Sequence, residues 1–369
     1  MTEFLFILCS FFLISYSFIH FLVWKGLKKL SFEPSISQSK FSIIIAARNE
    51  EKNIAQCLTS LIQQHYPKDF FEIIVVNDRS SDNTLSNIKE FEQQYSNIHS
   101  LTISSLSSDL PLKKNALNEG IKKSKFDILV FTDADSIAPP TWLQEMAKAF
   151  SPEIGVVAGY SPFAKTSIKN SFGKNFLRYE EMKNSLGAAA GIGLNKAYMC
   201  TGRNFAYRKS IFEKVGGFEK IKHSISGDDD LFIQLVQKNT QWKMRYLTSP
   251  ESFVETQPPK NFQQFLNQRK RHFSTGKYYP LRMKIIFSAI HLFNISTLIT
   301  LFVLPFYGII LLVSKFLIDI ITAKQGKKLF HEKISFIEII FYEVLLVLYN
   351  LLIGPLGFIG KFEWKGTRS

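Results

Sequence analysis

The longest hydrophobic runs of this chain lie at its two ends. Phe4–Val23 is an uncharged apolar run that is long enough to cross a bilayer as a helix. A cleaved signal peptide is the alternative, but no positively charged n-region precedes the run. Trp24 and Lys25 follow it, and an aromatic and basic flank is typical of the cytoplasmic end of an anchor. We therefore predict a transmembrane anchor over residues 1–30.

Further apolar runs lie in residues 281–369. The run Ile285–Val313 is interrupted by Pro305, and it fits either two tightly packed spans or one long tilted helix. Another span is predicted from about Ile334 to Ile359. We therefore predict two or three transmembrane spans in this C-terminal region.

The lysines beside these runs predict the orientation in the membrane. They are concentrated in Lys25–Lys29, after the first run, and in Ala323–Lys333, before the last one. Positively charged segments next to spans stay on the cytoplasmic side, so both segments are expected there. The pattern predicts a multi-pass protein of the cytoplasmic (inner) membrane, with residues 40–280 facing the cytoplasm.

Residues 40–280 alternate between short apolar runs and longer amphipathic ones. Short runs rich in β-formers predict buried strands, and the amphipathic runs predict helices. This alternation predicts an α/β fold with a mostly parallel sheet and right-handed crossovers. The predicted strands are 41–47, 71–76 and 126–131, and the predicted helices are 51–64, 84–94, 115–123 and 140–150.

The net charge of +14 at pH 7 narrows the range of partners. It fits a domain held against an anionic cytoplasmic leaflet, or one that handles phosphorylated substrates. The basic residues are dispersed and form no basic helix, so no nucleic-acid partner is expected. The three cysteines, Cys9, Cys57 and Cys200, make no disulfide framework and agree with a reducing, cytoplasmic setting.

Acidic residues follow the predicted strands where each strand ends. Glu50 comes just after the first strand, Asp78 after the second, and Asp133 and Asp135 directly after the third. The carboxyl ends of parallel strands meet at one edge of a sheet, where open sheets bind ligands. Two carboxylates on one short turn suit a Mg²⁺ or Mn²⁺ ion that also holds a substrate diphosphate. Taken alone, such a pair also fits a helix cap or a solvated turn.

Between residues 41 and 279, short motifs follow one another in a set order: AARNE (46–50), VNDRSSDNT (76–84), KKNAL (113–117), DAD (133–135), TGRNFAYR (201–208), VGGF (215–218), GDDD (227–230) and QRKRH (268–272). In this order they resemble the inverting glycosyltransferases of family 2, which have the GT-A fold for nucleotide-diphospho-sugars. The membrane-bound branch of that family includes hyaluronan, cellulose and ceramide-glucosyl enzymes. Each motif is weak alone, and the ordered set is specific.

The resemblance implies how a donor is held. Glu50 and Asp78 are expected to contact the base and ribose of the nucleotide. Asp133 and Asp135 are expected to bind the donor diphosphate through Mg²⁺ or Mn²⁺, with Asp135 as the preferred direct ligand. Such an ion neutralises the charge that develops on the leaving nucleoside diphosphate. Uridine is the expected base, and guanosine is the alternative.

Basic residues are expected near the same phosphates. Lys114 is assigned there together with its neighbour Lys113 as an alternative, although a solvated basic turn would explain either lysine. Arg271 matches the arginine of the family motif Gln-x-x-Arg-Trp, and a guanidinium matches phosphate geometry. His272 replaces the tryptophan of that motif, which puts the acceptor platform in doubt. The same segment predicts an amphipathic helix near 261–275 that lies on the bilayer.

The acidic motif is expected to supply a general base. An inverting transfer needs one base to take the proton of the acceptor hydroxyl. Aligning Gly227-Asp228-Asp229 with the related Thr-Glu-Asp form assigns this role to Asp229. Neighbouring carboxylates raise one another's pKa values, which suits a base. The alternative is a helix N-terminus, where acidic residues favour the helix dipole. By resemblance, the acceptor and lid region contains Gly202, Asn204, Asp228 and Gln268.

These features predict an enzyme that moves one sugar from a nucleotide-diphospho-sugar to a lipid-linked or membrane-proximal saccharide acceptor. A processive polysaccharide synthase is the nearest alternative, disfavoured by the few C-terminal spans and by His272. A non-catalytic membrane-bound module that binds nucleotide sugars is another. The carboxylates at 78, 133, 135 and 229 are present, which favours an enzyme over that module.

Overall fold

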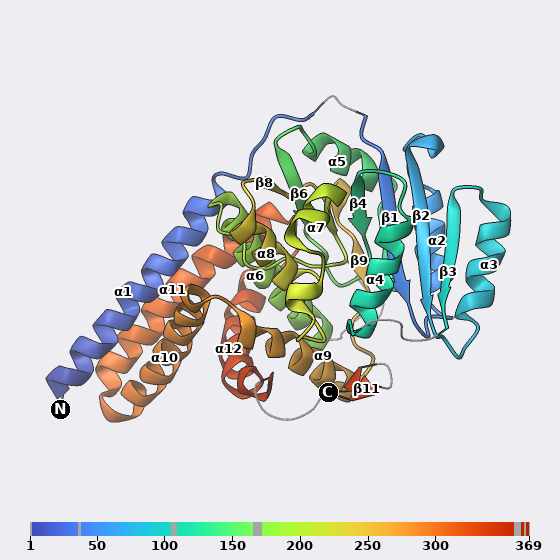
Figure 1. Ribbon diagram of the computed structural model, residues 1–369. Coiled ribbons are helices and arrows are strands. Elements are labelled where there is room, and N and C mark those ends of the chain that lie inside the picture. Colours follow the sequence, from blue (N-terminus) through green and yellow to red (C-terminus); the bar gives the residue numbers. More distant parts are fainter. Residues whose placement is uncertain are drawn as a thin grey trace.

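The computed structural model describes residues 2–35, 38–104, 109–164, 172–357, 363–364 and 367–368. It consists of a sheet domain and a bundle of long helices that projects from one side of it (Figure 1). The strands are β1 (Phe41–Ala47), β2 (Phe71–Asp78), β3 (Ile98–Ile103), β4 (Ile128–Phe131), β5 (Ser136–Ile137), β6 (Ile154–Gly159), β7 (Phe205–Arg208), β8 (Lys243–Leu247), β9 (Glu255–Thr256), β10 (Glu363–Trp364) and β11 (Thr367–Arg368).

The main sheet has seven strands in the order β3-β2-β1-β4-β7-β6-β8. The strands β3, β2, β1 and β4 are parallel to one another, and β7 is the strand that runs antiparallel to its neighbours β4 and β6. From β1, the chain first adds β2 and β3 on one side and then returns to add β4 on the other side. The boundary between β1 and β4 is therefore the topological switch point, where open α/β sheets bind ligands. The predicted α/β class with a mostly parallel sheet is confirmed.

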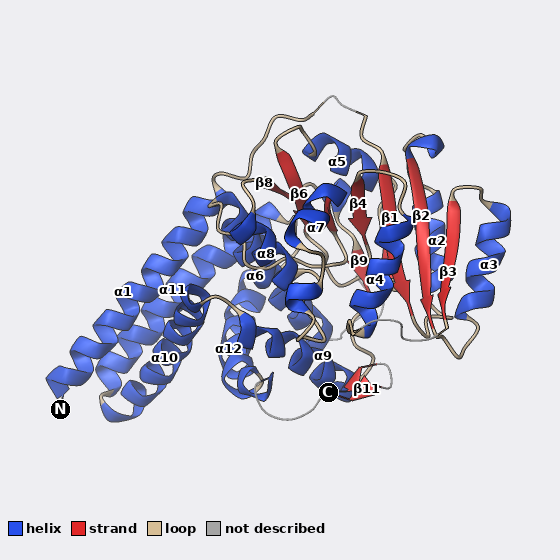
Figure 2. Ribbon diagram, in the orientation of Figure 1, coloured by secondary structure: helices blue, strands red, loops and turns tan. Residues whose placement is uncertain are grey.

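Helices cover both faces of the sheet (Figure 2). In β1, Ile43 and Ile45 face one layer and Ile44 faces the other, because successive strand residues point to opposite faces. The first layer contains α2 (Ile54–Ile62), α3 (Thr84–Gln94) and α5 (Trp142–Ala149). The second contains α4 (Leu112–Lys123), α6 (Phe172–Gly193), α7 (Lys209–Val215) and α8 (Asp230–Asn239).

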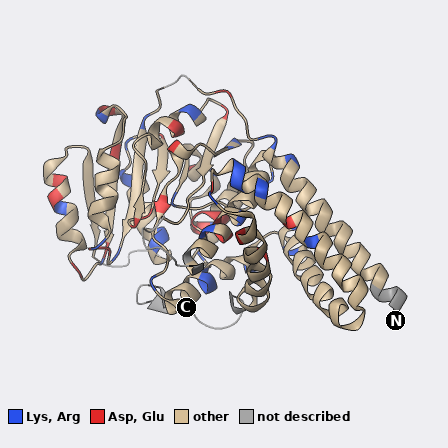
Figure 3. Cartoon of the chain, turned by 180° about the vertical axis from the view of Figure 1, so that it is seen from behind, with Lys and Arg blue, Asp and Glu red and all other residues tan. Residues whose placement is uncertain are grey.

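Three helices of the bundle are long and apolar enough to cross a bilayer: α1 (Thr2–Leu27), α10 (Leu281–Val303) and α11 (Pro305–Leu329). Their outward-facing side chains are large and apolar, as with Phe302, which is 83% exposed. Figure 3 shows few charged residues along these helices compared with the sheet domain. Such an exposed apolar surface is typical of helices that contact a membrane or a partner.

The C-terminal region contains two such helices rather than three among the described residues. The chain breaks at Leu304, before Pro305, and α10 and α11 pack against each other as a hairpin, so the single long tilted helix is excluded. The further span predicted from Ile334 to Ile359 is instead α12 (Phe336–Leu352), which has 17 residues. Tyr342 of α12 packs into the core of the sheet domain.

The elements between the spans follow the sequence pattern closely. All three predicted strands and all four predicted helices exist, with ends displaced by up to three residues. The helix predicted from Asn115 begins at Leu112, which places Lys113 and Lys114 in its first turn. The predicted interfacial helix near 261–275 is α9 (Phe262–Ser274).

Helix α4 lies very close to the sheet at Gly120, and this contact generates a prediction. A Cβ atom at this position would lie 2.7 Å from Cγ2 of Ile44. Gly120→Ala should therefore destabilise the fold by about 1–3 kcal/mol through overpacking, although Gly→Ala in an open helix is ordinarily stabilising. Thermal unfolding in detergent measures the change. Lys123→Ala, an exposed change in the same helix, is the control, and an unchanged midpoint for Gly120→Ala would contradict the close packing.

Candidate active site

The carboxyl edge of the sheet gathers the acidic residues that the sequence singled out. Asp78 is the last residue of β2, and Glu50 lies in the loop after β1. Asp133 is the second residue after the end of β4. The neighbours β2, β1 and β4 are parallel, so their ends open toward the same side. Asp133 and Asp135 share one turn, in which the Ser136 N–H donates to the Asp133 carbonyl (3.1 Å). The sequence prediction that these residues meet at one edge is confirmed.

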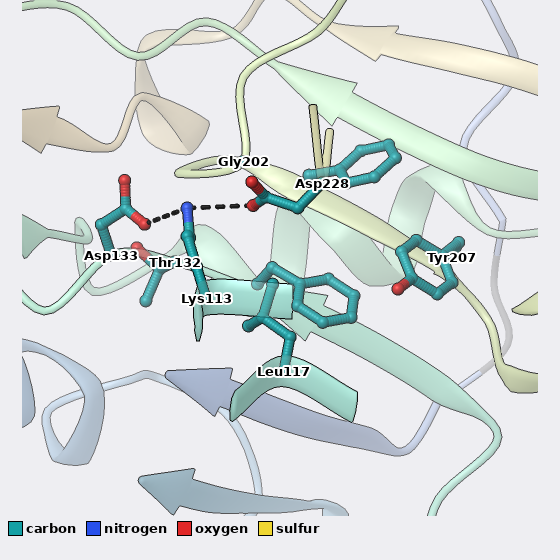
Figure 4. A pocket seen from close by; sticks show the side chains of 9 residues that line it. Lys113, Leu117, Thr132, Asp133, Gly202, Tyr207 and Asp228 are labelled. Atoms are coloured by element: carbon teal, nitrogen blue, oxygen red, sulfur yellow. Dashed lines mark ion pairs between the residues drawn. The ribbon is translucent and has the colours of Figure 1, made fainter. Parts of the chain in front are cut away.

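At the centre of the site, the Lys113 ammonium lies between two carboxylates (Figure 4). Its Nζ is 3.0 Å from Oδ1 of Asp133 and 3.0 Å from Oδ2 of Asp228. Lys113 belongs to α4, Asp133 follows β4, and Asp228 precedes α8, so three segments distant in sequence converge on one charge. This triad joins the acidic motif to the carboxyl edge of the sheet.

The surrounding charges fix the protonation states of Lys113 and Asp133. Burial acts to lower the pKa of Lys113, but the carboxylates of Asp133, Asp228 and Asp229 outweigh it and raise the pKa above its ordinary value. Burial acts to raise the pKa of Asp133, but Lys113 and Arg203 outweigh it and lower the pKa. Lysine and carboxylate are therefore both charged at neutral pH.

A small cavity of about 10 Å³ lies beside the triad, enough for about one water molecule. Its polar wall is formed by Lys113, Asp133 and Asp228, and its apolar wall includes Leu117 and Phe205. The ammonium therefore lies between the two carboxylates, with apolar side chains beside it, which strengthens each charge–charge contact.

The second predicted donor-site lysine, Lys114, points away from the triad. It is fully buried, and its Nζ donates to the carbonyl oxygens of Ser224 and Ser226, the latter at 2.7 Å. Burial lowers its pKa to about 8. The structure thus places Lys113, the alternative, in the site, whereas Lys114 fixes the segment that leads into the acidic motif.

The acidic motif stands at the N-terminus of α8, and its members have different surroundings. Asp229 is the N-cap, and its two carboxylate oxygens accept from the backbone N–H groups of Gly202 (2.8 Å) and Asp230 (2.7 Å). Burial and the Asp228 charge raise the pKa of Asp229. Asp228 is also buried, with its carboxylate paired to Lys113. Asp229 is thus the cap of α8, and Asp228 is the neighbour whose carboxylate faces Lys113.

Asp230 links the acidic motif to the segment that enters the α10–α11 hairpin. Its Oδ2 accepts from the Tyr279 hydroxyl (2.6 Å) and from the Thr275 hydroxyl (3.0 Å). Burial and the Asp229 charge raise its pKa to about 7. The two hydroxyl donors favour the ionised form and oppose this rise.

The loops after β1 and β2 are braced against each other at the expected nucleotide subsite. The Glu50 N–H donates to the Thr84 hydroxyl (2.7 Å), and the Ser81 N–H donates to Oδ1 of Asn49 (2.9 Å). Asp78 is buried and accepts from its neighbour Arg79 at 2.8 Å. The base and ribose contacts predicted for Glu50 and Asp78 stay predictions. Glu50 lies in the first of these loops, and Asp78 directly precedes the second.

Helix α9 brings the basic motif to the same region. Arg271 Nη1 donates to the Ser226 hydroxyl (3.3 Å), and its charge helps to lower the pKa of Asp133. Burial, followed by the Arg271 charge, lowers the pKa of His272 well below its ordinary value, so this side chain is neutral. Gln268 is half-buried, with its Oε1 atom shielded from solvent and without a hydrogen-bond partner among the described residues.

Of the residues assigned to the acceptor and lid region, Asn204 has a different place. It is fully buried, its Nδ2 donates to the carbonyl oxygens of Tyr160 (2.9 Å) and Ser252 (2.8 Å), and its Oδ1 accepts from Trp142 (2.9 Å). This side chain holds three segments together and presents no free group to an acceptor, so the assignment is corrected. Gly202 does border the site, where its N–H binds Asp229.

The turn that contains Asp133 and Asp135 offers the oxygen ligands that Mg²⁺ and Mn²⁺ prefer. No three metal-binding side chains converge anywhere in the part of the chain that the structure describes. Mg²⁺ is commonly held by one or two carboxylates, with substrate phosphates and water completing its shell. The donor set therefore fits an ion that arrives with a diphosphate, rather than an ion caged by the protein alone.

Comparison with known proteins agrees with this geometry. Residues 42–216 match the profile of Glycosyl transferase family 2. The chain is similar to the protein named "Probable glycosyltransferase YdaM" of Bacillus subtilis, with 27% identity over 286 residues (76% of this chain and 66% of the relative). It is also similar to the glycosyltransferase AglE of Haloferax volcanii, with 27% identity over 237 residues (64% and 71%). The matched part thus spans about two thirds of each relative's length.

A solved structure with a similar fold is a mannosyltransferase from Pyrobaculum calidifontis, determined with GDP-Man and Mn²⁺. The TM-score is 0.54 at 17% identity, and the match covers 95% of this chain and 96% of that one. At this identity the likeness concerns the fold, and it confirms the predicted GT-A architecture.

The raised pKa of Asp230 generates a prediction about stability. The folded chain keeps this proton up to about pH 7, whereas an unfolded chain loses it near the ordinary value of 3.8. Stability therefore falls as the pH rises through this window. Asp230→Asn removes this titratable group. The difference in thermal midpoint, wild type minus variant, should therefore be smaller at pH 8 than at pH 5. A difference that is the same at both pH values would contradict the raised pKa.

Proposed function

We propose that this chain, which carries a glycosyl transferase family 2 domain, transfers a sugar from a nucleotide-diphospho-sugar to a hydroxyl of a lipid-linked or membrane-proximal saccharide. The proposal rests on the Lys113 ammonium, which links Asp133 to Asp228. Its Nζ lies 3.0 Å from a carboxylate oxygen of each residue. A diphosphate at the Asp133 turn and an acceptor at Asp228 would be adjacent there.

The donor would lie along the carboxyl edge of the sheet. The braced loops that contain Glu50 and Asp78 offer carboxylates to the base and ribose, as the family resemblance implies. Asp133 and Asp135 would hold the divalent ion, which supplies Lewis-acid assistance to the departing diphosphate when bound. That the similar mannosyltransferase structure contains GDP-Man and Mn²⁺ supports a metal-bound donor and leaves guanosine open beside uridine.

Basic side chains stabilise the charge that develops on the leaving group. Lys113 can exchange the Asp133 carboxylate for a phosphate oxygen, since both are anionic acceptors within reach of one ammonium. Arg271 adds a guanidinium from α9, on the side of Ser226. Preorganised cations of this kind, in a site shielded from water, are among the largest contributions to catalysis.

Asp228 is our choice of general base in place of Asp229. The two oxygens of Asp229 hold the backbone at the start of α8, whereas the Asp228 side chain faces the triad. Asp228 would take the acceptor hydroxyl proton as the acceptor oxygen bonds to the anomeric carbon. The bond from that carbon to the phosphate oxygen breaks at the same time, and the nucleoside diphosphate leaves with inverted configuration at the carbon.

The helical bundle supports a membrane location for this chemistry. Three helices long and apolar enough to span a bilayer flank the sheet domain, and the basic segments predicted to be cytoplasmic adjoin that domain. We propose a multi-pass protein of the cytoplasmic membrane with its catalytic domain in the cytoplasm. The acceptor would reach the site where α9, with exposed Phe262 on one face, meets the membrane surface.

The function is tested by release of nucleoside diphosphate from a panel of UDP- and GDP-sugars, using detergent-solubilised protein with membrane lipids as acceptor. Release from one donor, dependent on added lipid, is expected. The same reaction distinguishes single transfer from processive synthesis, because a ladder of products from one donor sugar would show the latter. Failure to release any nucleotide across the panel would contradict the proposal.

The choice of base predicts different outcomes for two neighbouring substitutions. Asp228→Asn should reduce transfer by about a hundredfold or more, as expected for loss of a general base, while nucleoside diphosphate binding is retained. Asp229→Asn should mainly weaken the cap of α8, at about 1 kcal/mol, and keep most of the activity. The reverse pattern, with Asp229→Asn inactive and Asp228→Asn active, would restore Asp229 as the base.

The metal assignment predicts that Asp135→Ala removes the Mn²⁺-dependent part of nucleoside diphosphate binding. The reason is that the turn would keep one carboxylate, Asp133, which is already paired with Lys113. Isothermal titration with and without Mn²⁺ measures the effect. Asp127→Ala, an exposed change on the opposite edge of the sheet, is the control. Equal Mn²⁺ dependence in wild type and Asp135→Ala would exclude Asp135 as a ligand.

A further inference from the structure

Helix α6 lies between the sheet domain and the membrane helices, where it contacts both. At its C-terminal end, a Cβ atom on Gly193 would lie 2.1 Å from the Gly26 carbonyl oxygen of α1. A Cβ atom on Gly326 of α11 would lie 2.7 Å from Leu186 of α6. The first contact is with backbone and requires glycine, whereas the second is with the end of the Leu186 side chain. Both show that α6 packs closely against α1 and α11.

The other side of α6 holds elements of the active site. Glu180 pairs with Arg269 of α9 at 2.5 Å, and Glu181 pairs with Arg203 at 3.2 Å. Arg269 and Glu180 are each 3% exposed, so this contact is deep in the protein. Arg269 is two residues before Arg271 on α9. The Glu180–Arg269 pair therefore links α6 to the helix that carries Arg271.

One turn further along α6, Lys183 reaches into the helical bundle. Its Nζ is 2.7 Å from Glu343 of α12 and 3.8 Å from Asp319 of α11. Glu343 and Asp319 are 1% and 2% exposed, and the Tyr179 hydroxyl also donates to Glu343. A single lysine of α6 thus neutralises carboxylates on two separate C-terminal helices.

Buried ion pairs of this kind are costly unless every charge has a partner, and removing one partner is strongly destabilising. Asp319 also pairs with Lys315 of α11, whereas Lys183 is the cation that Glu343 contacts among the described residues. The α11–α12 connection is held in the same way, since Glu332 binds Arg178 of α6 at 2.7 Å. The charges of α6 therefore fix its register against the bundle.

We propose that Lys183 is a positioning residue through which the membrane helices set the geometry of the donor-phosphate site. A series of contacts makes the connection. Lys183 contacts α11 and α12, Glu180 of the same helix contacts Arg269, and Arg269 shares α9 with Arg271. Lys183 itself touches no reacting group. The inference rests on the proposed function, because it takes Arg271 to contact the donor diphosphate.

Binding of nucleotides to the full-length protein tests this. Arg271 should contact the phosphates and not the nucleoside. The readout is therefore the affinity for nucleoside diphosphate divided by the affinity for nucleoside, both measured with Mn²⁺. Arg271→Ala should lower this ratio about tenfold or more, as expected for loss of a charge-assisted hydrogen bond. Lys183→Met should lower it in the same direction, and Lys183→Arg should restore it because the pairing charge is kept.

Two further variants separate positioning from folding. Lys183→Met/Glu343→Gln removes both charges, so it should recover much of the stability that the single change loses while keeping the lowered ratio. Lys324→Met is the matched control, an exposed lysine of α11 whose loss should leave the ratio unchanged. Wild-type protein that binds no nucleotide would refute the proposed function instead. If the wild type binds and Lys183→Met keeps the wild-type ratio, the positioning role is wrong and the function stands.

Discussion

The active site depends on one ammonium held between two carboxylates. Lys113 lies 3.0 Å from both Asp133 and Asp228, which come from opposite sides of the site. Without that cation, the buried carboxylate of Asp228 and the half-buried carboxylate of Asp133 would repel each other beside the small cavity. The contact therefore fixes the distance between the turn after β4 and the start of α8. In the proposed function, a donor phosphate would take over the same cation, because phosphate and carboxylate are both anionic acceptors.

The second constraint is that the sheet domain and the membrane helices share one core. Ala323 of α11 and Tyr342 of α12 are buried in the same cluster as Phe131 and Phe205 of the sheet. The ring of Phe330 stacks on Tyr160, with ring centroids 4.3 Å apart. The two regions meet through apolar packing and buried ion pairs together, so they are not loosely tethered units. The position of the long helices is therefore coupled by packing to the sheet domain.

Several features were predictable because they depend on local pattern. Strand β1 and helix α1 follow from unbroken apolar runs, and the positions of Glu50, Asp78 and Asp133 follow from where parallel strands end. Residues 160–200 gave no signal, although α6 lies there. Its pairing residues, such as Lys183, look like ordinary surface charges in sequence, because their partners are more than a hundred residues away.

The sequence alone determined the α/β class, the first apolar helix and the set of carboxylates at the sheet edge, since periodicity and motif order are properties of nearby residues. The number of long apolar helices in the C-terminal region was decided by the tertiary structure. Only the tertiary structure distinguished Lys113 from Lys114 and Asp228 from Asp229, and removed Asn204 from the acceptor region. Adjacent residues on a helix point about 100° apart. Which of two neighbours faces the site is therefore decided by packing against distant segments, and no local pattern contains that information.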